Sequence, residues 1–288
     1  MPELPEVETI KRDLEKKILK KKIIRIRIKD KKIGQSGLER VKGKYFLDID
    51  RIGKLLIFKL SEKGYFMLVH LKMTGQLVYA FKKFLVAGGH SLSSRSDMAA
   101  VGGKLPNKHT RAIFEFKDGG RLFFNDLRRF GYIKMVNKSE LNLLKESFGI
   151  EPLKTDFIYR NILKIFKNRK TSLKAVLLNQ KLISGIGNIY ADEILFRAGL
   201  RPDRVAGSLK PTEIKKLYRA TNYIIRRAIK YRGTTFSDYV DAKGRRGNFS
   251  TQLKVYGRSG KKCYKCSNVI KKIRIAGRGT SFCPKCQK

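Results

Sequence analysis

The chain has 288 residues, and its 66 lysines and arginines against 24 acidic residues leave a formal net charge of +42. With 42% hydrophobic residues it can form a core, which excludes a disordered tail. No apolar stretch reaches the ~18 residues of a membrane span, and the start of the chain lacks the apolar segment of a signal peptide. We therefore expect a soluble, cytoplasmic protein of two or three domains that binds a polyanion, above all nucleic acid.

The first part of the chain predicts a short helix followed by a β-rich domain. Residues 2–17 suit a helix because Pro5 fits a first helical turn and the acidic residues beside it favour the positive end of the helix dipole. Apolar residues then recur with a period of two, which predicts a sandwich or barrel. The expected strands are 24–28, 55–60, 65–73, 111–116, 121–124 and 132–136. Residues 82–107, rich in Gly, Ser and Lys, predict a long inserted loop.

After about residue 137 the pattern becomes helical. Residues 173–183 and 189–198 have helical spacing, and a long helix is expected over 211–231. The turn between the first two helices, residues 184–188, contains two glycines and ends at Asn188. Amides at such a helix start can hold a phosphate, although the same turn also fits tight helix packing alone. Residues 233–250 predict a mobile connection.

All four cysteines lie near the C-terminus, in two pairs separated by sixteen residues. The pairs are Cys263 with Cys266 and Cys283 with Cys286. This spacing is typical of a zinc site with four thiolate ligands, whereas structural disulfides are disfavoured in a reducing cytosol. We predict one structural Zn²⁺ that replaces a hydrophobic core for this short segment. The residues between the pairs predict a hairpin whose tip carries Arg278, either solvated or offered to a partner.

The N-terminus carries a second chemical feature. Pro2 follows Met1, and a small second residue normally permits removal of the methionine. The freed secondary amine could attack a sugar carbon and form a cationic iminium, with Glu3 placed to move protons. Proline and glutamate are equally ordinary at the start of a helix, so these residues alone leave both interpretations open.

Eight short motifs occur in a fixed order along the chain. They are MPELPEVE at 1–8, HLKMTG at 70–75, KH at 108–109, DLRRFG at 126–131, GIEPL at 149–153, GIGNIYADE at 185–193, GTT at 233–235 and VYGR at 255–258, followed by the four cysteines. In this order the motifs resemble bacterial formamidopyrimidine-DNA glycosylase (8-oxoguanine DNA glycosylase/AP lyase). The resemblance covers essentially the whole chain apart from residues 82–107.

The resemblance implies an α+β multidomain protein with an N-terminal helix plus β-sandwich, a helix–two-turn–helix module and a C-terminal four-cysteine zinc finger. We place the catalytic domain at 1–136, a linker at 137–152, the DNA-binding helical domain at 153–235, and a flexible loop with the finger at 236–288. The implied activity is that of a bifunctional DNA glycosylase/AP lyase of base excision repair. Such an enzyme excises oxidised purines from double-stranded DNA, cuts abasic sites by β,δ-elimination, and acts as a monomer away from membranes.

The resemblance also implies four catalytic residues. Pro2 would form the Schiff base, and Glu3 would help to open or protonate the sugar. Lys54, otherwise one more lysine in a turn, would donate a proton around the elimination. Arg278 would bind phosphate from the finger loop and take part in the second elimination.

A further set of residues would contact DNA by the same resemblance: His109, Arg128, Arg169, Lys174 and Asn188. Met73, Arg128 and Phe130 would fill the gap left by the extruded nucleotide. This role is physically sensible, because removing a base from the stack costs a few kcal/mol and apolar wedges stabilise the gap. Without the resemblance, Met73 and Phe130 fit an ordinary strand core.

The chain departs from the family pattern at two positions beside these wedge residues. The family usually has Gly where Lys72 stands and Pro where Leu127 stands, and both changes could alter the preference for a lesion. The insertion at 82–107 could extend the rim that faces DNA.

Three alternatives stay open on the sequence. The nearest is an endonuclease VIII-like glycosylase for oxidised pyrimidines, which shares the N-terminal Pro-Glu and the three-part architecture. A non-enzymatic zinc-finger protein that binds nucleic acid would explain the charge and the cysteines but gives Pro2 no role. A metal-dependent nuclease is disfavoured, because the sequence shows no compact Asp/Glu/His cluster suited to hard cations.

Overall fold

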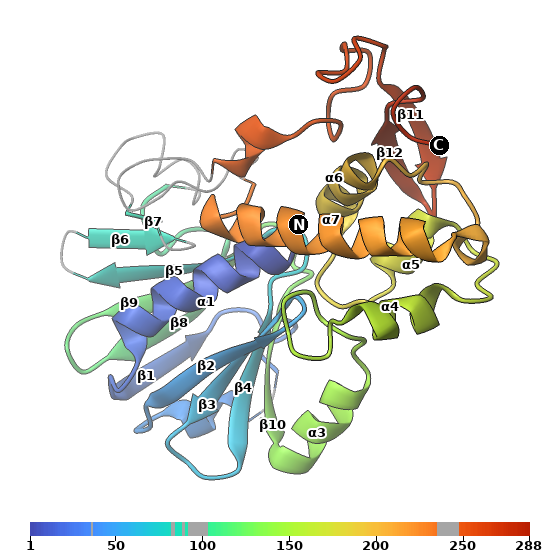
Figure 1. Cartoon of the computed structure of the whole chain (residues 1–288). Helices are drawn as coiled ribbons and strands as arrows, with labels where there is room; N and C mark the ends of the chain where they lie inside the picture. Colours follow the sequence, from blue (N-terminus) through green and yellow to red (C-terminus); the bar gives the residue numbers. More distant parts are fainter. Residues whose placement is uncertain (36, 82–83, 88–89, 92–102, 235–247) are drawn as a thin grey trace. The chain divides into compact units, whose positions relative to one another are not determined.

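The chain forms two compact units in a computed structural model, which describes all residues except 36, 82–83, 88–89, 92–102 and 235–247. The first unit consists of Met1–Glu146 and Tyr231–Ser250, and the second of Ser147–Lys230 and Thr251–Lys288 (Figure 1). The mixed helix and strand content agrees with the predicted α+β class. None of the helices in the described part of the chain is long and apolar enough to span a membrane.

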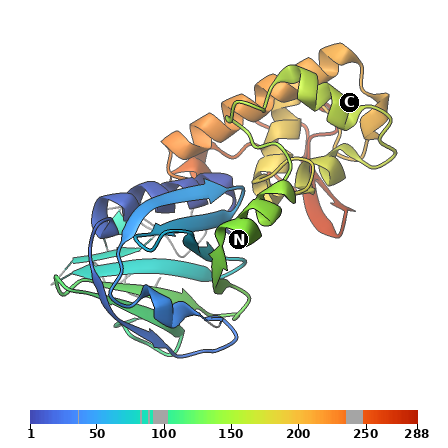
Figure 2. The same ribbon diagram turned by 90° about the horizontal axis from the view of Figure 1, so that it is seen from below.

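The first unit begins with helix α1, Leu4–Ile18. Pro5 lies in its first turn, and a capping box closes its start, in which the backbone N–H of Glu3 donates to the side chain of Glu6 at 2.9 Å. One face of α1 is buried. Because its apolar residues recur every three or four positions, α1 packs against β2 (Phe46–Ile52) and β3 (Leu55–Leu60) of one sheet and β5 (Gly75–Phe81) of the other (Figure 2).

Two antiparallel sheets follow. The larger has the order β1 (Ile23–Ile28), β8 (Thr110–Phe116), β9 (Arg121–Asp126), β5 (Gly75–Phe81), β6 (Phe84–Ala87) and β7 (His90–Ser91). The smaller has the order β10 (Tyr132–Asn137), β4 (Tyr65–His70), β3 (Leu55–Leu60) and β2 (Phe46–Ile52). Helix α3, Lys138–Glu146, follows β10.

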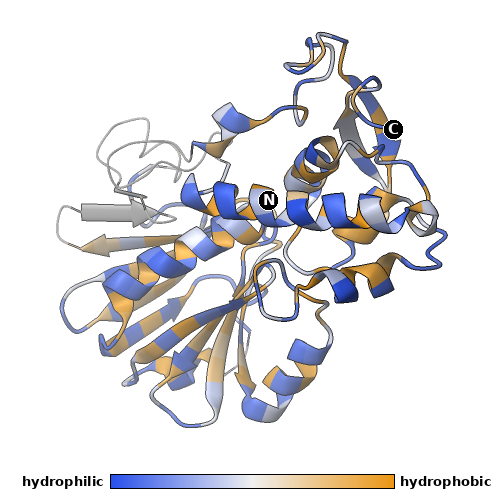
Figure 3. Ribbon diagram, viewed as in Figure 1, coloured by the Kyte–Doolittle hydropathy of each residue, from blue (hydrophilic) through white to orange (hydrophobic). Residues whose placement is uncertain are grey.

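The inner faces of both sheets share one hydrophobic core. Phe114 and Phe124 of the larger sheet lie in the same buried cluster as Phe46 and Phe58 of the smaller sheet, together with the inner face of α1. Figure 3 shows the corresponding alternation of hydrophobic and hydrophilic residues along the strands. The arrangement is that of a β-sandwich covered by a helix, as predicted.

The predicted strands are confirmed within a few residues, but the prediction for residues 82–107 is partly wrong. Residues 84–87 and 90–91 form β6 and β7, which extend the larger sheet beyond β5. β6 is hydrogen-bonded to β5, and β7 to β6, and the Gly-, Ser- and Lys-rich composition does not indicate this pairing. Residues 82–83, 88–89 and 92–102 of this segment lie outside the described residues.

The second unit contains four α-helices among its described residues. They are α4 (Tyr159–Phe166), α5 (Leu173–Leu178), α6 (Asn188–Ala198) and α7 (Pro211–Lys230). The helical predictions for this region are confirmed, although α5 ends five residues earlier than expected, at Leu178. Helix α6 packs against α5 and α7.

A two-stranded hairpin completes the second unit. Its strands are β11, Lys271–Ile275, and β12, Arg278–Phe282. The two-residue turn consists of Ala276 and Gly277, both with positive φ (47° and 72°), which matches the twist of a tight hairpin. The C-terminal residues bind the end of α6, where the N–H of Lys288 donates to the carbonyl of Gly199 at 3.0 Å.

Candidate active site

The N-terminal residues are fixed by the start of α1. Glu3 is buried at the N-cap position, and Pro2 directly before it is also buried, whereas Met1 is 43% exposed. The predicted nucleophile and its acid therefore belong to an ordered helix start and not to a loose tail.

The turn that carries Lys54 is held by α1 as well. Arg51 in β2 is buried; its Nε lies 3.0 Å from Oε2 of Glu8, and its Nη1 donates to the carbonyl of Gly53 at 3.0 Å. Burial pushes the pKa of Glu8 upward, but the charge of Arg51 and hydrogen bonds from Arg12 and Arg51 bring it below its ordinary value. The charged Glu8–Arg51 pair thus fixes the turn in front of Lys54, which is itself buried.

His70 lies beside this turn, because the register of β3 and β4 pairs it with Leu55. Burial and the nearby charges of Lys72 and Lys54 lower the pKa of His70 to about 3, so its imidazole is neutral at physiological pH. Its Nδ1 accepts a hydrogen bond from the N–H of Lys72 at 3.0 Å. Sequence analysis assigned His70 no role, and only the strand register brings it next to Lys54.

A second cluster forms where the β4–β5 turn meets the β9–β10 loop. Residues Gly75 and Asp126 are paired across β5 and β9, which places the turn containing Met73 beside the loop containing Arg128 and Phe130. The N–H of Gly75 closes this turn on the carbonyl of Leu71 at 2.9 Å. A Cβ at Gly75 would lie 2.5 Å from that carbonyl oxygen, so only glycine fits.

The buried carboxylate of Asp126 organises both segments. It accepts hydrogen bonds from the hydroxyl of Thr74, from the N–H of Arg128 at 3.2 Å and from the N–H of Gly131 at 2.7 Å. The N–H of Arg128 also lies 2.9 Å from Oγ1 of Thr74. One carboxylate therefore ties the Met73 turn to the Arg128 loop.

The side chains on this loop project outward. Phe130 is 50% exposed, Leu127 is 61% exposed, and the guanidinium of Arg128 lies 4.8 Å from the centre of the Phe130 ring. The structure thus brings together two of the three predicted wedge residues in direct contact, beside the turn of the third, Met73. Exposed apolar groups on a rigid support are what insertion into a base stack requires.

His109 joins the same cluster through its backbone. Its carbonyl accepts the N–H of Asp126 at 2.9 Å, and its own N–H donates to the side chain of Asn107 at 2.9 Å. Arg111 lies there too, with its Nε donating to the carbonyl of Asp126 at 2.9 Å. Sequence analysis missed Arg111, because nothing in its local pattern separates it from other strand arginines.

The two departures from the family pattern have different structural settings. Lys72 has a φ of 49°, a left-handed conformation that costs a residue with a Cβ about 1 kcal/mol and costs glycine little. Leu127 replaces the usual proline at an exposed position and adds an apolar group next to the wedge residues.

Lys174 in the second unit is not placed where it was predicted. It is 0% exposed, and its Nζ binds Oδ1 of Asp192 at 2.6 Å and Oγ1 of Thr280 at 2.8 Å. A direct contact with DNA is therefore not available to this ammonium group in this structure. Lys174 instead holds strand β12 of the hairpin against α6.

Asn188 and Arg278 lie at two ends of the same network. The Nδ2 of Asn188, at the start of α6, donates to the carbonyl of Gly279 at 3.1 Å. Oδ2 of Asp192 accepts the N–H of Ser281 at 2.9 Å. Because Gly279 follows Arg278 directly, these bonds position the exposed Arg278 at the hairpin tip relative to the start of α6.

The two consecutive carboxylates of α6 bind different parts of the C-terminal segment. Glu193, next to Asp192, accepts the N–H groups of Lys254, Val255 and Tyr256 at 2.9–3.0 Å. Burial raises the pKa of Glu193 although these amides favour its charged form. Burial likewise raises the pKa of Asp192, to about 6, against the effect of Lys174. Both residues lie in the motif at 185–193, but the sequence alone does not predict a function for either.

Arg169 occupies another part of the second unit. It is exposed on the loop between α4 and α5, where its Nε donates to the carbonyl of Ile165 at 3.1 Å. Its position leaves it available to a phosphate.

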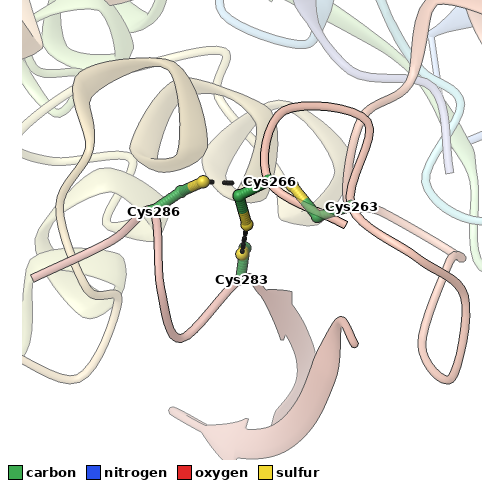
Figure 4. Close-up of side chains that lie close together, drawn as sticks. All are labelled: Cys263, Cys266, Cys283 and Cys286. Atoms are coloured by element: carbon green, nitrogen blue, oxygen red, sulfur yellow. Dashed lines mark hydrogen bonds between the residues drawn. The ribbon is translucent and has the colours of Figure 1, made fainter. Parts of the chain in front are cut away.

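The four cysteines are arranged to bind a metal. Their sulfur atoms all lie within 4.8 Å of one another, and Cys266 and Cys283 are 3.4 Å apart (Figure 4). Zn–S bonds of about 2.3 Å in a tetrahedron require sulfurs about 3.8 Å apart, so the residues present fit zinc. Four thiolates fill all the positions of a tetrahedral zinc ion, so these cysteines suit a closed structural site.

The parts of the chain match three known domains in order. Residues 1–133 match the formamidopyrimidine-DNA glycosylase N-terminal domain, and residues 148–240 match the H2TH domain of that glycosylase. Residues 260–288 match the zinc finger found in FPG and IleRS.

Full-length relatives agree with these matches. The chain is 43% identical over 293 residues to the formamidopyrimidine-DNA glycosylase of Carboxydothermus hydrogenoformans and 41% identical over 295 residues to that of Desulfitobacterium hafniense, with 100% of each chain covered. A Lactococcus lactis FPG mutant solved in complex with Fapy-dG containing DNA has a TM-score of 0.84, 33% identity and 100% coverage of both chains. Lactococcus lactis Fpg with an abasic site containing DNA has a TM-score of 0.84 over 99% of each chain.

Fold, site and relatives together define a DNA glycosylase of base excision repair. The chain belongs to the formamidopyrimidine-DNA glycosylase family, whose members are glycosylase/AP lyases. Membership of this family rules out the alternative of a non-enzymatic zinc-finger protein.

Replacing Asp126 tests the cluster that supports the wedge residues. In Asp126→Asn an amide N–H₂ faces backbone N–H groups, so at least one hydrogen bond is lost at a cost of about 1–3 kcal/mol. We expect lesion excision to fall at least tenfold. Asp118→Asn, which changes a carboxylate in a distant turn, is the matched control. Equal rates for the Asp126 and Asp118 variants would contradict the assigned role.

Replacing Asp192 tests the buried network of the second unit. Asp192→Asn leaves the ammonium of Lys174 buried without its counter-ion, which typically costs 3–5 kcal/mol. We expect a corresponding fall in the free energy of unfolding measured with denaturant. The double variant Lys174→Met/Asp192→Asn removes both charges and should recover much of the loss; a single variant within ~1 kcal/mol of wild type would argue against the network.

Proposed function

We propose that this enzyme excises oxidised purines, namely 8-oxoguanine and formamidopyrimidines, from double-stranded DNA and then cuts the abasic strand by β,δ-elimination. It acts as a monomer in the cytoplasm, on nucleoid DNA. The observation that carries the proposal is the ordered Pro2-Glu3 start of α1, held by the same helix that fixes the Lys54 turn. The Lactococcus lactis complexes with Fapy-dG and abasic DNA support the choice of substrates.

The reaction begins at the amine of Pro2 after Met1 has been removed. The lone pair of this nitrogen attacks the anomeric carbon of the damaged nucleotide, and the bond to the base breaks as the base leaves. Glu3 protonates the sugar ring oxygen and assists ring opening. The product is an iminium, because a secondary amine that forms a double bond to carbon keeps a positive charge.

The iminium then drives strand cleavage. It withdraws electrons from the neighbouring sugar carbon, so that a proton there is lost and the 3′ phosphate leaves in β-elimination. Lys54 exchanges protons around this step, and its ammonium charge is held beside the neutral His70. Arg278 binds the phosphate that leaves in the second, δ-elimination.

Extrusion of the damaged nucleotide precedes this chemistry. Met73, Arg128 and Phe130 fill the vacated position in the stack, and the hydrogen bonds of Asp126 keep their two segments together. His109, Arg169 and Asn188 contact the phosphates. Lys174 serves indirectly in this scheme, by holding the hairpin that presents Arg278.

One zinc ion would be held by Cys263, Cys266, Cys283 and Cys286. Its contribution is to fold the finger, since four thiolates leave no position for a reacting group. A zinc ion bound there would help to keep β11 and β12 in place, and with them Arg278 next to their turn.

A wider lesion range has one specific observation in its favour. Wild-type Lactococcus lactis FPG was solved in complex with an oxidized pyrimidine containing DNA, and that chain has a TM-score of 0.84 to this one. Oxidised pyrimidines, the substrates of endonuclease VIII-like enzymes, are therefore the second candidate substrates. Parallel excision rates on 8-oxoguanine and thymine glycol duplexes decide which class is preferred.

The nucleophile is tested at the N-terminus. Borohydride should reduce the iminium on an abasic duplex and trap a covalent adduct through Pro2. Pro2→Gly should lose most of the base-release activity, by at least a hundredfold. Mass spectrometry of the wild-type N-terminus should show that Met1 is absent. Failure to trap an adduct, or an active enzyme that retains Met1, would falsify the Schiff-base mechanism.

Metal removal tests the role of the finger. Because zinc replaces a hydrophobic core there, a strong chelator under denaturing conditions should release one zinc per chain and leave the finger unfolded after dilution. We expect DNA cleavage to be lost and to return when zinc is added. Cleavage by fully metal-free enzyme at the wild-type rate would show that the finger is dispensable.

A further inference from the structure

Helix α7 carries a stripe of basic side chains on its exposed face. Lys215, Lys216, Arg219, Arg226 and Lys230 are all exposed. At 3.6 residues per turn these five residues, together with Tyr223, fall within about 100° of the helix circumference. They extend over about 22 Å of helix, and no acidic residue occurs between Ile214 and Lys230.

An exposed aromatic ring in the stripe holds two further arginines in place. The guanidinium of Arg197 at the end of α6 stacks 3.3 Å from the centre of the Tyr223 ring. Arg227 donates to the hydroxyl of Tyr223 at 3.0 Å and to Oε1 of Gln252 at 2.7 Å. These contacts order cationic groups before any partner binds and so reduce the entropic cost of binding.

The stripe does not belong to the DNA-contacting surface already assigned in this unit. The buried residues of α7, centred on Leu217, Thr221 and Ile224, face about 160° away from the centre of the stripe. Asn188 starts α6 whereas Arg197 stands near its end, about 14 Å further along the helix axis. The basic stripe therefore faces away from the surface that α7 packs against α6.

We propose that the exposed face of α7, defined by Lys215, Lys216, Arg219, Tyr223, Arg226 and Lys230, is a second binding site for the phosphate backbone of duplex DNA outside the lesion. Its positive charges are complementary to the phosphates, and each phosphate neutralised releases condensed counter-ions. Binding is independent of base sequence, because contacts to the phosphate backbone carry no sequence information. The site retains the enzyme on DNA or holds a second segment while the active site is occupied.

The test uses a ternary complex. The full-length enzyme is first saturated with an unlabelled duplex that contains an abasic-site analogue, and a fluorescent undamaged duplex is then titrated into the 1:1 complex. The stripe variant replaces the five basic residues with glutamine, whose helix propensity is close to that of lysine and arginine. A control variant removes five exposed lysines of the first unit in the same way: Lys17, Lys31, Lys42, Lys63 and Lys117.

We expect the wild-type complex to bind the labelled duplex with a slope of about −3 in a plot of log K against log salt, as three phosphate contacts require. The stripe variant should bind it at least tenfold more weakly, the control variant within threefold of wild type. Single-turnover excision by the stripe variant should stay within twofold of wild type, which shows that it is folded.

The proposal is overturned if the wild-type complex does not bind a second duplex, or if both variants weaken binding equally, which would indicate net charge alone. It is also overturned if the stripe variant keeps DNA binding but loses binding to vesicles of anionic phospholipid.

Discussion

The few carboxylates of this strongly basic chain hold its functional parts in place. On α1, Glu8 binds Arg51 and through it the Lys54 turn, while Glu6 accepts the N–H of Glu3 at one oxygen. The other oxygen of Glu6 accepts the N–H of Thr234 at 2.7 Å. Gly233 has a φ of 82°, a left-handed conformation that favours glycine. Pro2, the turn that carries Lys54 and the Gly233–Thr234 segment are therefore all held by helix α1.

Buried carboxylates also hold the other segments that carry candidate site residues. Asp126 joins the Met73 turn to the Arg128 loop, Asp192 pairs with the buried Lys174, and Glu193 accepts the backbone N–H groups of residues 254–256, ahead of the finger. Each of these carboxylates is buried, where a charge is stable only with several partners. In a chain with 66 basic residues and 24 acidic ones, these buried carboxylates accept hydrogen bonds from backbone N–H groups, a hydroxyl and one ammonium group and so fix the segments that carry them. Most of the other lysines and arginines give the surface its positive charge.

Features that depend on neighbouring residues in the sequence were predicted correctly. Features that depend on contacts between distant residues were not. The cysteine spacing is local and was sufficient to predict the metal site, and alternation over 24–28 predicted β1. Strands β2 and β5 were missed: β2 mixes acidic and basic residues into its apolar pattern, and β5 follows directly on the Met73 turn, which the predicted strand 65–73 had absorbed. The wedge role of Met73, Arg128 and Phe130 is a proposal that rests on the resemblance, and their proximity could not be predicted because it depends on the pairing of Gly75 with Asp126.

Lys174, which the resemblance assigns to DNA contact, is fully buried in this structure. An ammonium group with no exposed surface cannot exchange its partners for a phosphate without breaking its bonds to Asp192 and Thr280. Thr280 lies in β12, the strand that begins with Arg278, and Asp192 of α6 also accepts the N–H of Ser281 in that strand, so Lys174 helps to hold the hairpin against α6. A buried ion pair contributes little net stability compared with an apolar pair of similar size. What the pair orients is the carbonyl of Gly279, to which Lys174 donates at 3.3 Å and Asn188 at 3.1 Å.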